Sequence, residues 1–540
     1  MPRNMQDYEA TRASFRWQVP ERFNFATDVV DHHAGNGDGL ALIWADAQGR
    51  EQRFRFSDIS RLSMRAAAAL AARGIGKGDI VVVMTPRIPE WQIAMVACLR
   101  LGAVAIPCIE MLTAKDLAFR IEHAGAKGVI CRASQAAKFE GLLGGVTARL
   151  SIGGASPGFD DWDEALAGAA PVIEAADVMA DNPAVLYYTS GSTGMPKGVL
   201  HAARAIYAWR GSAEFWLDLG PGDIIWCTAD IGWSKAGTSI LFGPWGMGAC
   251  SFFYDGPFDP AERLRLLERH RVTVYCAPGT ELFRVVDEQI STYDLSSLRH
   301  TVSSGETLNT VVADRWRART GIPILEAYGQ TETLMTLLNY PCKAVRDGSM
   351  GLPMPGLDID VIDQDGQRLP VDTEGEIAIR LPAPQMMLGY LHDPEKTAQA
   401  IVQAGDERWF LTGDRGARDA DGYFYYRGRR DDVISSSGYR VGPSEVENAL
   451  LEHPAVLECA VIGKPDRERG EIVKAFVVLR DEVALTDEFV REIQEHVKKT
   501  TAPYKYPREI EALAELPKTL TGKIQRKALR DLERSRLSDR

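Results

Sequence analysis

The sequence of 540 residues has no long apolar run, no closely paired cysteines and no excess of positive charge. Its longest apolar stretch, residues 93–109, is interrupted by Arg100 and Gly102 and is too short to span a bilayer. The eight cysteines form no C-x-x-C pair, so we expect buried free thiols rather than disulfides or a zinc site. A net charge of −12 argues against a nucleic-acid partner. The first 20 residues mix both charge signs and lack an apolar core, so we expect a cytoplasmic protein without a signal peptide.

Strands that are apolar on both faces alternate with helices over the first four-fifths of the chain. This pattern predicts an α/β fold with a mostly parallel sheet covered on both sides. Closely spaced strands between Gly348 and Arg380 predict a small antiparallel subdomain. Beyond a charged stretch, the order helix, two strands, helix predicts a separate α+β unit of about 100 residues. We therefore expect a large N-terminal domain at 1–428, a hinge at 429–432, a mobile C-terminal domain at 433–530 and a solvated tail at 531–540.

The strongest local signal is the loop Tyr188-Thr-Ser-Gly-Ser-Thr-Gly-Met-Pro-Lys-Gly198, which follows an apolar strand. Backbone N–H groups exposed by its glycines, four hydroxyl side chains and Lys197 can surround phosphate oxygens. The loop differs from a Walker A loop, because Pro196 stands where glycine is required and Gly198 follows the lysine. An ordinary glycine-rich turn needs neither the hydroxyls nor the lysine, so we interpret the loop as a phosphate-binding segment.

Six further motifs follow in order: Ser304-Gly-Glu-Thr307, Tyr328-Gly-Gln-Thr-Glu332, Thr412-Gly-Asp414, Gly428-Arg-Arg-Asp-Asp432, Ser437-Gly-Tyr-Arg440 and Pro517-Lys-Thr-Leu-Thr-Gly-Lys523. Together with the loop, they resemble the motifs of the adenylate-forming superfamily, which includes acyl- and aryl-CoA synthetases, luciferases and peptide-synthetase adenylation domains. The resemblance covers nearly the whole chain, and residues 436–453 and 501–526 look most similar to medium-chain acyl-CoA synthetases. Thr307 departs from that subfamily's pattern, which usually has proline there.

The resemblance implies a role for each motif. Tyr328 would stack on adenine, Asp414 would accept the ribose hydroxyls, and Thr331 would bind the α-phosphate. Glu332 would hold Mg²⁺, a hard cation that prefers oxygen ligands. Lys523 would bridge the substrate carboxylate and the α-phosphate, where negative charge accumulates during attack. The implied catalytic residues are Lys523, Thr331, Glu332 and Arg440, and the implied ATP- and coenzyme A-binding residues are Thr189, Ser190, Gly191, Ser192, Thr193, Gly194, Lys197, Gly305, Glu306, Thr307, Glu326, Tyr328, Gly329, Gln330, Asp414, Arg429, Ser437, Gly438, Tyr439, Arg469, Tyr506 and Arg508.

The implied reaction joins a small carboxylic acid first to AMP and then to coenzyme A, with ATP, Mg²⁺ and coenzyme A as cofactors. Because both steps use one carbonyl, the small domain would swing about Asp431 to bring first Lys523 and then residues 437–439 to the site. One alternative is an adenylation enzyme that loads a separate carrier protein. Another is a nucleotide-binding regulator without turnover, against which Lys523 and Glu332 argue. Self-association is left open by the sequence.

Three residues, Trp233, Gly329 and Leu334, would line the acyl pocket by the same resemblance. Acetate-activating relatives carry tryptophan at the position of Gly329, so we expect open space there. This predicts activation of a fatty acid of about four to ten carbons, or of a compact aromatic acid, because each buried methylene contributes about 0.8 kcal/mol. The alternative is that Gly329 only permits a tight turn and that Trp233 and Leu334 set the pocket depth.

Overall fold

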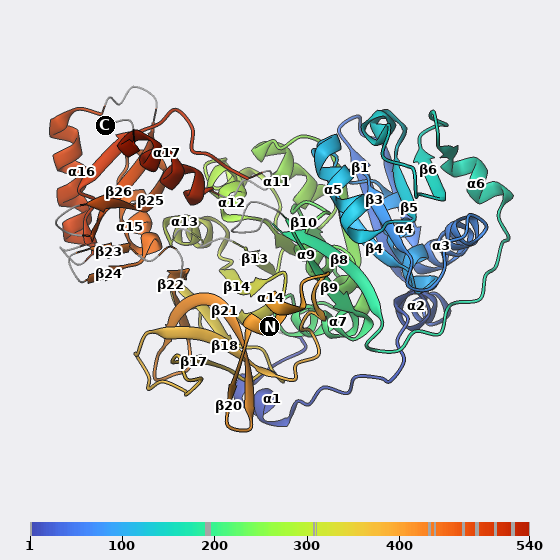
Figure 1. The fold of residues 1–540 in the computed structure, drawn as a ribbon, viewed down its shortest axis with the longest axis horizontal. Coiled ribbons are helices and arrows are strands. Elements are labelled where there is room, and N and C mark those ends of the chain that lie inside the picture. The colour runs from blue at the N-terminus through green and yellow to red at the C-terminus, as the bar shows by residue number, and fades with distance from the viewer. Residues whose placement is uncertain are drawn as a thin grey trace.

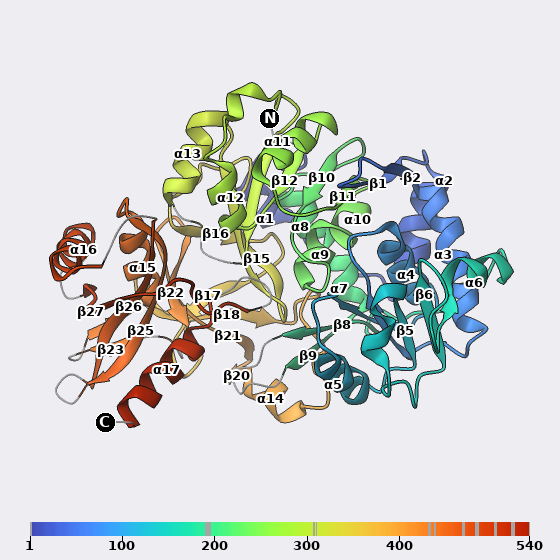
Figure 2. The same cartoon turned by 90° about the horizontal axis from the view of Figure 1, so that it is seen from above.

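The computed structural model describes residues 3–189, 196–305, 308, 310–429, 432, 434–436, 439–466, 470–480, 485–501, 505–519 and 524–538. The chain forms an α/β layer at one end of the molecule, a large sheet in the middle and a smaller C-terminal unit at the other end (Figure 1). The same order is seen from above in Figure 2. The α/β fold expected from the sequence is confirmed, with two sheets where the sequence pattern suggested one.

The first sheet contains the phosphate-loop strands at one side. Its central strands have nearly continuous buried side chains, as expected for parallel strands covered on both faces. In spatial order the described strands are β19 (Gly389–Tyr390), β9 (Lys197–Ala202), β8 (Pro183–Thr189), β4 (Val104–Cys108), β3 (Ile80–Met84), β5 (Gly128–Arg132), β6 (Ala148–Ile152) and β7 (Asp160–Asp161).

The second sheet runs through the middle of the molecule and changes character along its width. From β1 to β14 its main strands are parallel, and from β14 to β17 they are antiparallel, which confirms the predicted antiparallel subdomain. In spatial order the described strands are β17 (Ile359–Ile362), β18 (Gly375–Leu381), β21 (Glu407–Arg418), β22 (Phe424–Arg429), β16 (Ser349–Pro353), β15 (Leu334–Leu338), β14 (Ile324–Gln330), β13 (His300–Ser304), β12 (Val274–Cys276), β10 (Ile224–Cys227), β11 (Cys250–Asp255), β1 (Leu40–Asp46) and β2 (Glu51–Arg55), with β20 (Ile401–Ala404) beside β21.

Helices cover the sheets, and their ends follow the sequence signals. In α5, the Thr113 hydroxyl accepts from the backbone N–H of Asp116, whose carboxylate accepts from the N–H of Thr113 in return. The helix ends at Gly125, in a left-handed conformation with φ of 63°. The helices of the two large layers are α1 (Tyr8–Ser14), α2 (His32–Gly35), α3 (Phe56–Ala71), α4 (Pro89–Arg100), α5 (Ala114–Ala124), α6 (Trp162–Gly168), α7 (Ala203–Ala208), α8 (Arg210–Phe215), α9 (Ser234–Ser239), α10 (Phe242–Gly246), α11 (Pro260–Arg269), α12 (Gly279–Val285), α13 (Thr310–Thr320) and α14 (Pro394–Gln399).

The C-terminal unit has its own sheet and core. Its elements are β23 (Ile434–Ser436), β24 (Tyr439–Val441), α15 (Pro443–Leu451), β25 (Val456–Asp466), β26 (Gly470–Leu479), α16 (Asp487–Thr500), β27 (Glu509–Ala512) and α17 (Arg526–Ser538). The order helix, two strands, helix agrees with the sequence-based expectation. A separate apolar cluster around Ile434, Val461 and Val497 lies inside this unit.

The tail predicted at 531–540 is helical as far as residue 538, and apart from Glu533 its described side chains are exposed. Residues 531–538 continue helix α17, and the Glu533 side chain is buried. Glu533 accepts a hydrogen bond of 2.8 Å from the equally buried Lys474 Nζ on β26. An ion pair of this kind fastens the helix to the sheet, because removing either partner would leave a buried charge without its counter-ion.

Two sequence-based expectations about composition can be compared directly. Seven of the eight cysteines are buried, Cys342 is partly exposed, and all eight are free thiols, as predicted. Over the described residues, no helix is both long and apolar enough to cross a membrane.

Candidate active site

A hydrogen-bonded cluster joins the motifs that the sequence places around the adenosine. Tyr328 Oη on β14 donates to Asp414 Oδ2 on β21 at 2.6 Å. Gln330 Nε2 donates to the same oxygen at 2.7 Å and to the carbonyl of Thr412 at 2.7 Å. Asp414 is buried and pairs in register with Arg429 on β22. Four predicted site residues, separated by up to 101 positions in the sequence, therefore meet at one place.

Burial and the Asp414 carboxylate both change the pKa of the Tyr328 hydroxyl. Burial, followed by the neighbouring carboxylate, raises the pKa of Tyr328 well above its usual value, so its hydroxyl keeps its proton and donates. Asp414 is held on the other side by its own backbone, since its N–H donates to the Thr412 hydroxyl at 3.1 Å. The Thr412 hydroxyl in turn donates to the Ile377 carbonyl at 2.7 Å. The carboxylate is thus fixed before any ligand arrives.

Gly305, which is predicted to lie on the other side of the adenine from Tyr328, directly follows β13. Gly305 has φ of 94°, and a Cβ there would meet nothing within 4 Å, so the backbone borders open space. The next turn is tied to β14 through Glu326, whose Oε1 accepts from the Leu308 N–H at 3.0 Å. Burial raises the pKa of Glu326 to about 7, although the Leu308 hydrogen bond lowers it. Glu306 and Thr307 lie outside the described residues.

The phosphate side is assembled from three separate segments. Thr189 at the end of β8 pairs with Lys197 at the start of β9, so the predicted loop connects two antiparallel strands. A Walker A loop leads from a strand into a helix, whereas this loop leads from one strand into another. The two loops therefore differ in structure as well as in sequence. Lys197 Nζ lies 5.5 Å from the ring centroid of Tyr390, whose hydroxyl donates to Glu332 Oε1 at 2.9 Å. Ser190, Gly191, Ser192, Thr193 and Gly194 lie outside the described residues.

Thr331 is positioned by a buried histidine. His201 Nε2 lies 2.7 Å from the Thr331 carbonyl, so Nε2 carries the proton, because a carbonyl oxygen only accepts. Burial lowers the pKa of His201 to about 4, and the ring is neutral at physiological pH. The Thr331 hydroxyl accepts from Ser234 Oγ at 3.3 Å, which brings helix α9 to the same place.

The acyl side differs from the sequence-based expectation at Gly329. A Cβ at this position would lie 1.9 Å from the Leu334 carbonyl oxygen and 2.8 Å from Met335 Cα. The expected open space beside Gly329 is therefore wrong, because the backbone of the neighbouring strand β15 fills it. Leu334 itself is buried and has φ of 56°, a conformation that β15 imposes at its first residue. Trp233 directly precedes α9, and its indole N–H has no partner among the described residues.

The structure describes the surroundings of some of the residues predicted in the C-terminal unit. Residues on either side of the Lys523 loop form an antiparallel bridge, Lys518 with Ile524, and the Gln525 N–H donates to the Pro517 carbonyl at 2.8 Å. The backbones of Tyr439 and Arg440 lie on β24, paired with Ser436 and Ser435. Arg508 Nη1 donates to Tyr506 Oη at 3.0 Å. Asp431, Ser437, Gly438, Arg469 and Lys523 lie outside the described residues.

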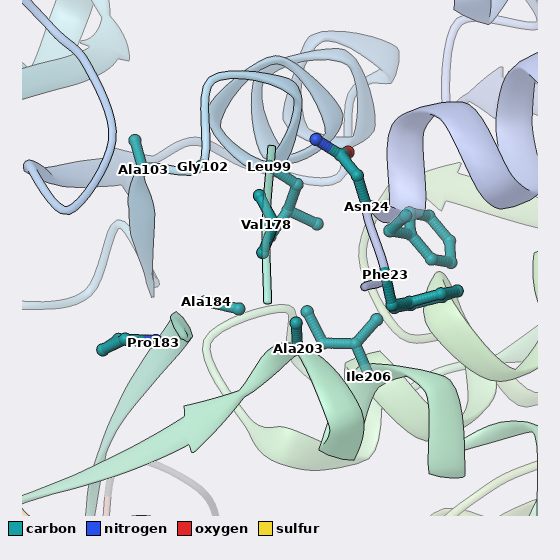
Figure 3. Close-up of a pocket in the computed structure, with 11 residues that line it drawn as sticks. Phe23, Asn24, Leu99, Gly102, Ala103, Val178, Pro183, Ala184, Ala203 and Ile206 are labelled. Atoms are coloured by element: carbon teal, nitrogen blue, oxygen red, sulfur yellow. The ribbon is translucent and has the colours of Figure 1, made fainter. Parts of the chain in front are cut away.

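A small recess elsewhere does not belong to this site. It lies between the Phe23–Asn24 segment, Leu99 on α4 and Ala203 and Ile206 on α7 (Figure 3). Its volume of about 10 Å³ is too small for more than one water molecule. None of the predicted site residues lines it, and we regard it as a packing defect between layers.

Comparison with known proteins agrees with this arrangement. A family model described as AMP-binding enzyme matches residues 30–391, and one described as AMP-binding enzyme C-terminal domain matches residues 445–523. The chain belongs to the AMP-binding enzyme family. The predicted superfamily is confirmed, and the two matched regions contain most of the motif residues described above.

Individual members of the AMP-binding enzyme family are similar over nearly the whole chain. Acyl-coenzyme A synthetase ACSM3, mitochondrial, of Mus musculus is 40% identical over 98% of this chain and 94% of its own length. The anthranilate CoA ligase AuaEII, solved in complex with anthranoyl-AMP, has a TM-score of 0.86 and 30% identity over 95% of this chain and 98% of its own. A benzoate CoA ligase from Burkholderia xenovorans LB400 has a TM-score of 0.82 and 28% identity over 94% of this chain and 100% of its own.

Several residues of this AMP-binding enzyme were not identified from the sequence. Tyr390 contacts both Lys197 and Glu332, and His201 holds the Thr331 carbonyl. Thr412 was quoted only as part of a motif, yet its hydroxyl positions the Asp414 backbone. Their sequence signals are weak, since a single tyrosine or histidine on an apolar strand is usually a core residue.

Proposed function

We propose that this AMP-binding enzyme is an ATP-dependent acid–thiol ligase that forms an acyl-AMP and then an acyl-CoA. We further propose that its acid is a fatty acid of about four to ten carbons or a compact aromatic acid. The observation that carries the proposal is the cluster of Tyr328, Gln330 and Asp414 beside Thr331 and Glu332. Its relatives, an acyl-coenzyme A synthetase and two aromatic acid–CoA ligases, support both parts.

Adenosine binding would use groups that are already oriented. The Asp414 carboxylate is oriented by hydrogen bonds from Tyr328 and Gln330, and it would accept hydrogen bonds from the ribose hydroxyls. Tyr328 and the backbone at Gly305 would enclose the adenine from two sides. Because these donors and acceptors need little rearrangement, binding energy is available for orienting the phosphates.

Glu332 fits the expected magnesium site. Its carboxylate is partly exposed, lies beside the predicted phosphate segment and accepts a hydrogen bond from Tyr390. Mg²⁺ typically uses one or two protein carboxylates together with water and substrate phosphates. Bound there with ATP, the ion would supply positive charge that neutralises the phosphate oxygens.

The first half-reaction would then depend mainly on positioning. The acid's carboxylate attacks the α-phosphorus, pyrophosphate leaves, and a mixed anhydride with AMP results. Thr331 would hold an α-phosphate oxygen, and Lys523 would stabilise the charge that develops as the carboxylate attacks. Arg440 would provide a further phosphate contact. No covalent enzyme nucleophile is required.

The second half-reaction would bring another surface of the C-terminal unit to the same carbonyl. The coenzyme A thiolate attacks the anhydride and AMP leaves. Ser437, Gly438 and Tyr439 would line the pantetheine path, with Arg469, Tyr506 and Arg508 near the nucleotide end. Strand β22 ends in the central sheet at Arg429 and β23 begins in the C-terminal sheet at Ile434. This change of sheet supports a domain boundary and hinge at 429–432, with Asp431 as the pivot.

The competing functions differ in their products. An enzyme that loads a carrier protein would accumulate acyl-AMP with free coenzyme A present, and a regulator would release no pyrophosphate. A cytoplasmic location stays a prediction, and the ACSM3 relative is a mitochondrial protein.

The decisive experiment incubates the protein with MgATP, coenzyme A and one acid at a time. The panel covers saturated acids from two to twelve carbons and benzoate, and AMP, pyrophosphate and thioester are quantified. We expect equal amounts of the three products, with acids of four to eight carbons or benzoate preferred over acetate. Release of ADP, or AMP formation that does not depend on the acid, would contradict the proposed ligase.

A further inference from the structure

Several polar groups around the start of helix α9 lie on the side of the site that, on the proposed function, would receive the acid. Helix α9 begins with Ser234, whose hydroxyl donates to the Thr331 hydroxyl. Thr331 is the residue that would hold the α-phosphate to which the acid becomes attached. The first turn of α9 therefore borders the path of the acid, and the residue after Ser234 is a lysine.

Lys235 carries a charge for which the described residues supply no acidic partner. Its Nζ donates to the Ser304 carbonyl at 3.0 Å, and no carboxylate of the described chain forms an ion pair with it. The side chain is only partly exposed. An ammonium group has three N–H donors, and one carbonyl satisfies one of them. The remaining N–H groups of the Lys235 ammonium are therefore available to acceptors of a ligand as well as to solvent.

The groups around Lys235 are polar as well. Cys227 and Cys276 are register partners on β10 and β12, and both thiols are buried. The hydrogen bond from Cys227, the charge of the Lys235 ammonium and the Ser239 hydroxyl lower the pKa of the Cys276 thiol, while burial raises it. The hydroxyl of Ser304 is buried and has no hydrogen-bond partner within the described residues.

These side chains gather at the carboxyl ends of parallel strands, the edge where open α/β sheets bind ligands. Strands β10, β12 and β13 all end here. A plain alkyl chain lying here would offer no acceptor to the remaining N–H groups of the Lys235 ammonium and no partner to the Ser304 hydroxyl. A buried donor that loses its partner is penalised, so these groups discriminate against ligands that lack an acceptor.

We infer that Lys235 contacts the acid and selects one that carries a second oxygen function besides the reacting carboxylate. A hydroxyl, a carbonyl or a second carboxylate would serve, because each can accept from the Lys235 ammonium. Within the proposed size range, this favours hydroxy acids, keto acids, dicarboxylic acids or hydroxybenzoates over the plain acids of equal carbon number.

The test compares pairs of acids that differ only in oxygen content. The pairs are butyrate with 3-hydroxybutyrate, butyrate with succinate, hexanoate with adipate, and benzoate with 2-hydroxybenzoate. AMP formation gives kcat/KM for each acid with the full-length wild type, with Lys235→Met and with Lys235→Arg. Wild type should prefer the oxygenated member of at least one pair by about tenfold or more, as expected for a hydrogen bond to a charged group. Lys235→Met should lose that preference, and Lys235→Arg should retain part of it.

Lys115→Met is a matched control, because Lys115 is also the second residue of a helix but is exposed and belongs to none of the predicted site motifs. It should leave every ratio unchanged. If the methionine variant fails to fold, the wild-type ratios and the arginine variant decide. A wild type that prefers the plain acid in all four pairs would overturn the inference, as would an oxygen preference that survives in a folded Lys235→Met variant. Absence of AMP with every acid would instead contradict the proposed function.

Discussion

The polar side chains on the proposed nucleotide side of the site are hydrogen-bonded to one another, whereas polar groups on the proposed acid side lack such partners in the described part of the chain. On the nucleotide side, Tyr328 and Gln330 both donate to one oxygen of Asp414, and the backbone around Asp414 is also held. On the acid side, the Ser304 hydroxyl and the Trp233 indole N–H have no partner among the described residues. On the proposed function, the contacts to the nucleotide would be preorganised, while polar groups on the acid side would remain available to the acid.

The largest effect is expected for Lys523→Ala, which would separate the two half-reactions. Removing one preorganised charge should reduce acyl-AMP formation by about 10²–10³-fold. Conversion of supplied acyl-AMP and coenzyme A to thioester should be nearly unchanged, because Lys523 would be turned away in that step. ATP–pyrophosphate exchange and thioester formation are measured separately. Lys518→Ala serves as a control, and an equal loss of both activities in a folded Lys523 variant would contradict the swinging domain.

Asp414→Asn should weaken the binding of ATP and leave the binding of the acid unchanged. The amide oxygen can still accept from Tyr328, but the charge that would receive the ribose hydroxyls is gone. Because hydrogen bonds to a charged group contribute about 1.5–3 kcal/mol, kcat/KM for ATP should fall by about 10–100-fold. The KM for the acid should change little, and steady-state kinetics with each substrate varied would show this. An equal rise in both KM values would mean that the two sides are not independent.

Gly329→Ala tests the residue at which the two sides meet. Its Cβ would overlap the Leu334 carbonyl, so the strands must separate, which typically costs about 1–3 kcal/mol. We expect a lower melting temperature and a similar loss of activity for all acids. A folded variant with unchanged melting temperature and a shifted chain-length preference would restore Gly329 as a pocket-lining residue.

The smallest expected effect is the pH dependence at Glu326. Burial raises its pKa to about 7 from 4.5, so the folded state binds the proton more tightly than the unfolded state does. This contribution to stability is complete below about pH 4.5 and is lost as the pH rises towards 7. Glu326→Gln keeps an oxygen that can accept from Leu308 and removes the titration. The variant should melt a few degrees above wild type at pH 8 and nearly with it at pH 5, as thermal unfolding at both pH values would show.

The sequence predicted which residues belong to the site, because they stand in motifs, but it did not predict which of them contact one another. Tyr328, Asp414 and Arg429 were identified separately, and the structure joins them at Asp414, which accepts from Tyr328 and pairs in register with Arg429. His201 lies 130 positions from Thr331 and could not be paired with it, because hydrophobic periodicity reports only which face of a strand is buried.

One expectation failed and another missed a buried contact, each for a local physical reason. The open space at Gly329 was inferred from a missing side chain, but a missing side chain also lets another backbone approach. The polar composition of residues 531–538 suggested solvation, and the burial of Glu533 depends on Lys474, which is on another element. Neither contact could be predicted from the sequence, because the prediction requires knowing which segments lie next to each other in the fold.

The last helix also has a consequence for building hybrid proteins. Arg530 Nη1 on α17 donates to Asp432 Oδ1 at 2.6 Å, and Arg526 binds Glu447 on α15. The first residues of the C-terminal unit are therefore tied to its final helix, and the two ends of the unit lie together. A segment with adjacent ends can be exchanged between relatives with few altered junctions. A transplanted unit should keep α17 complete, since cutting the chain before Arg526 would release Asp432 and Glu447 from these partners.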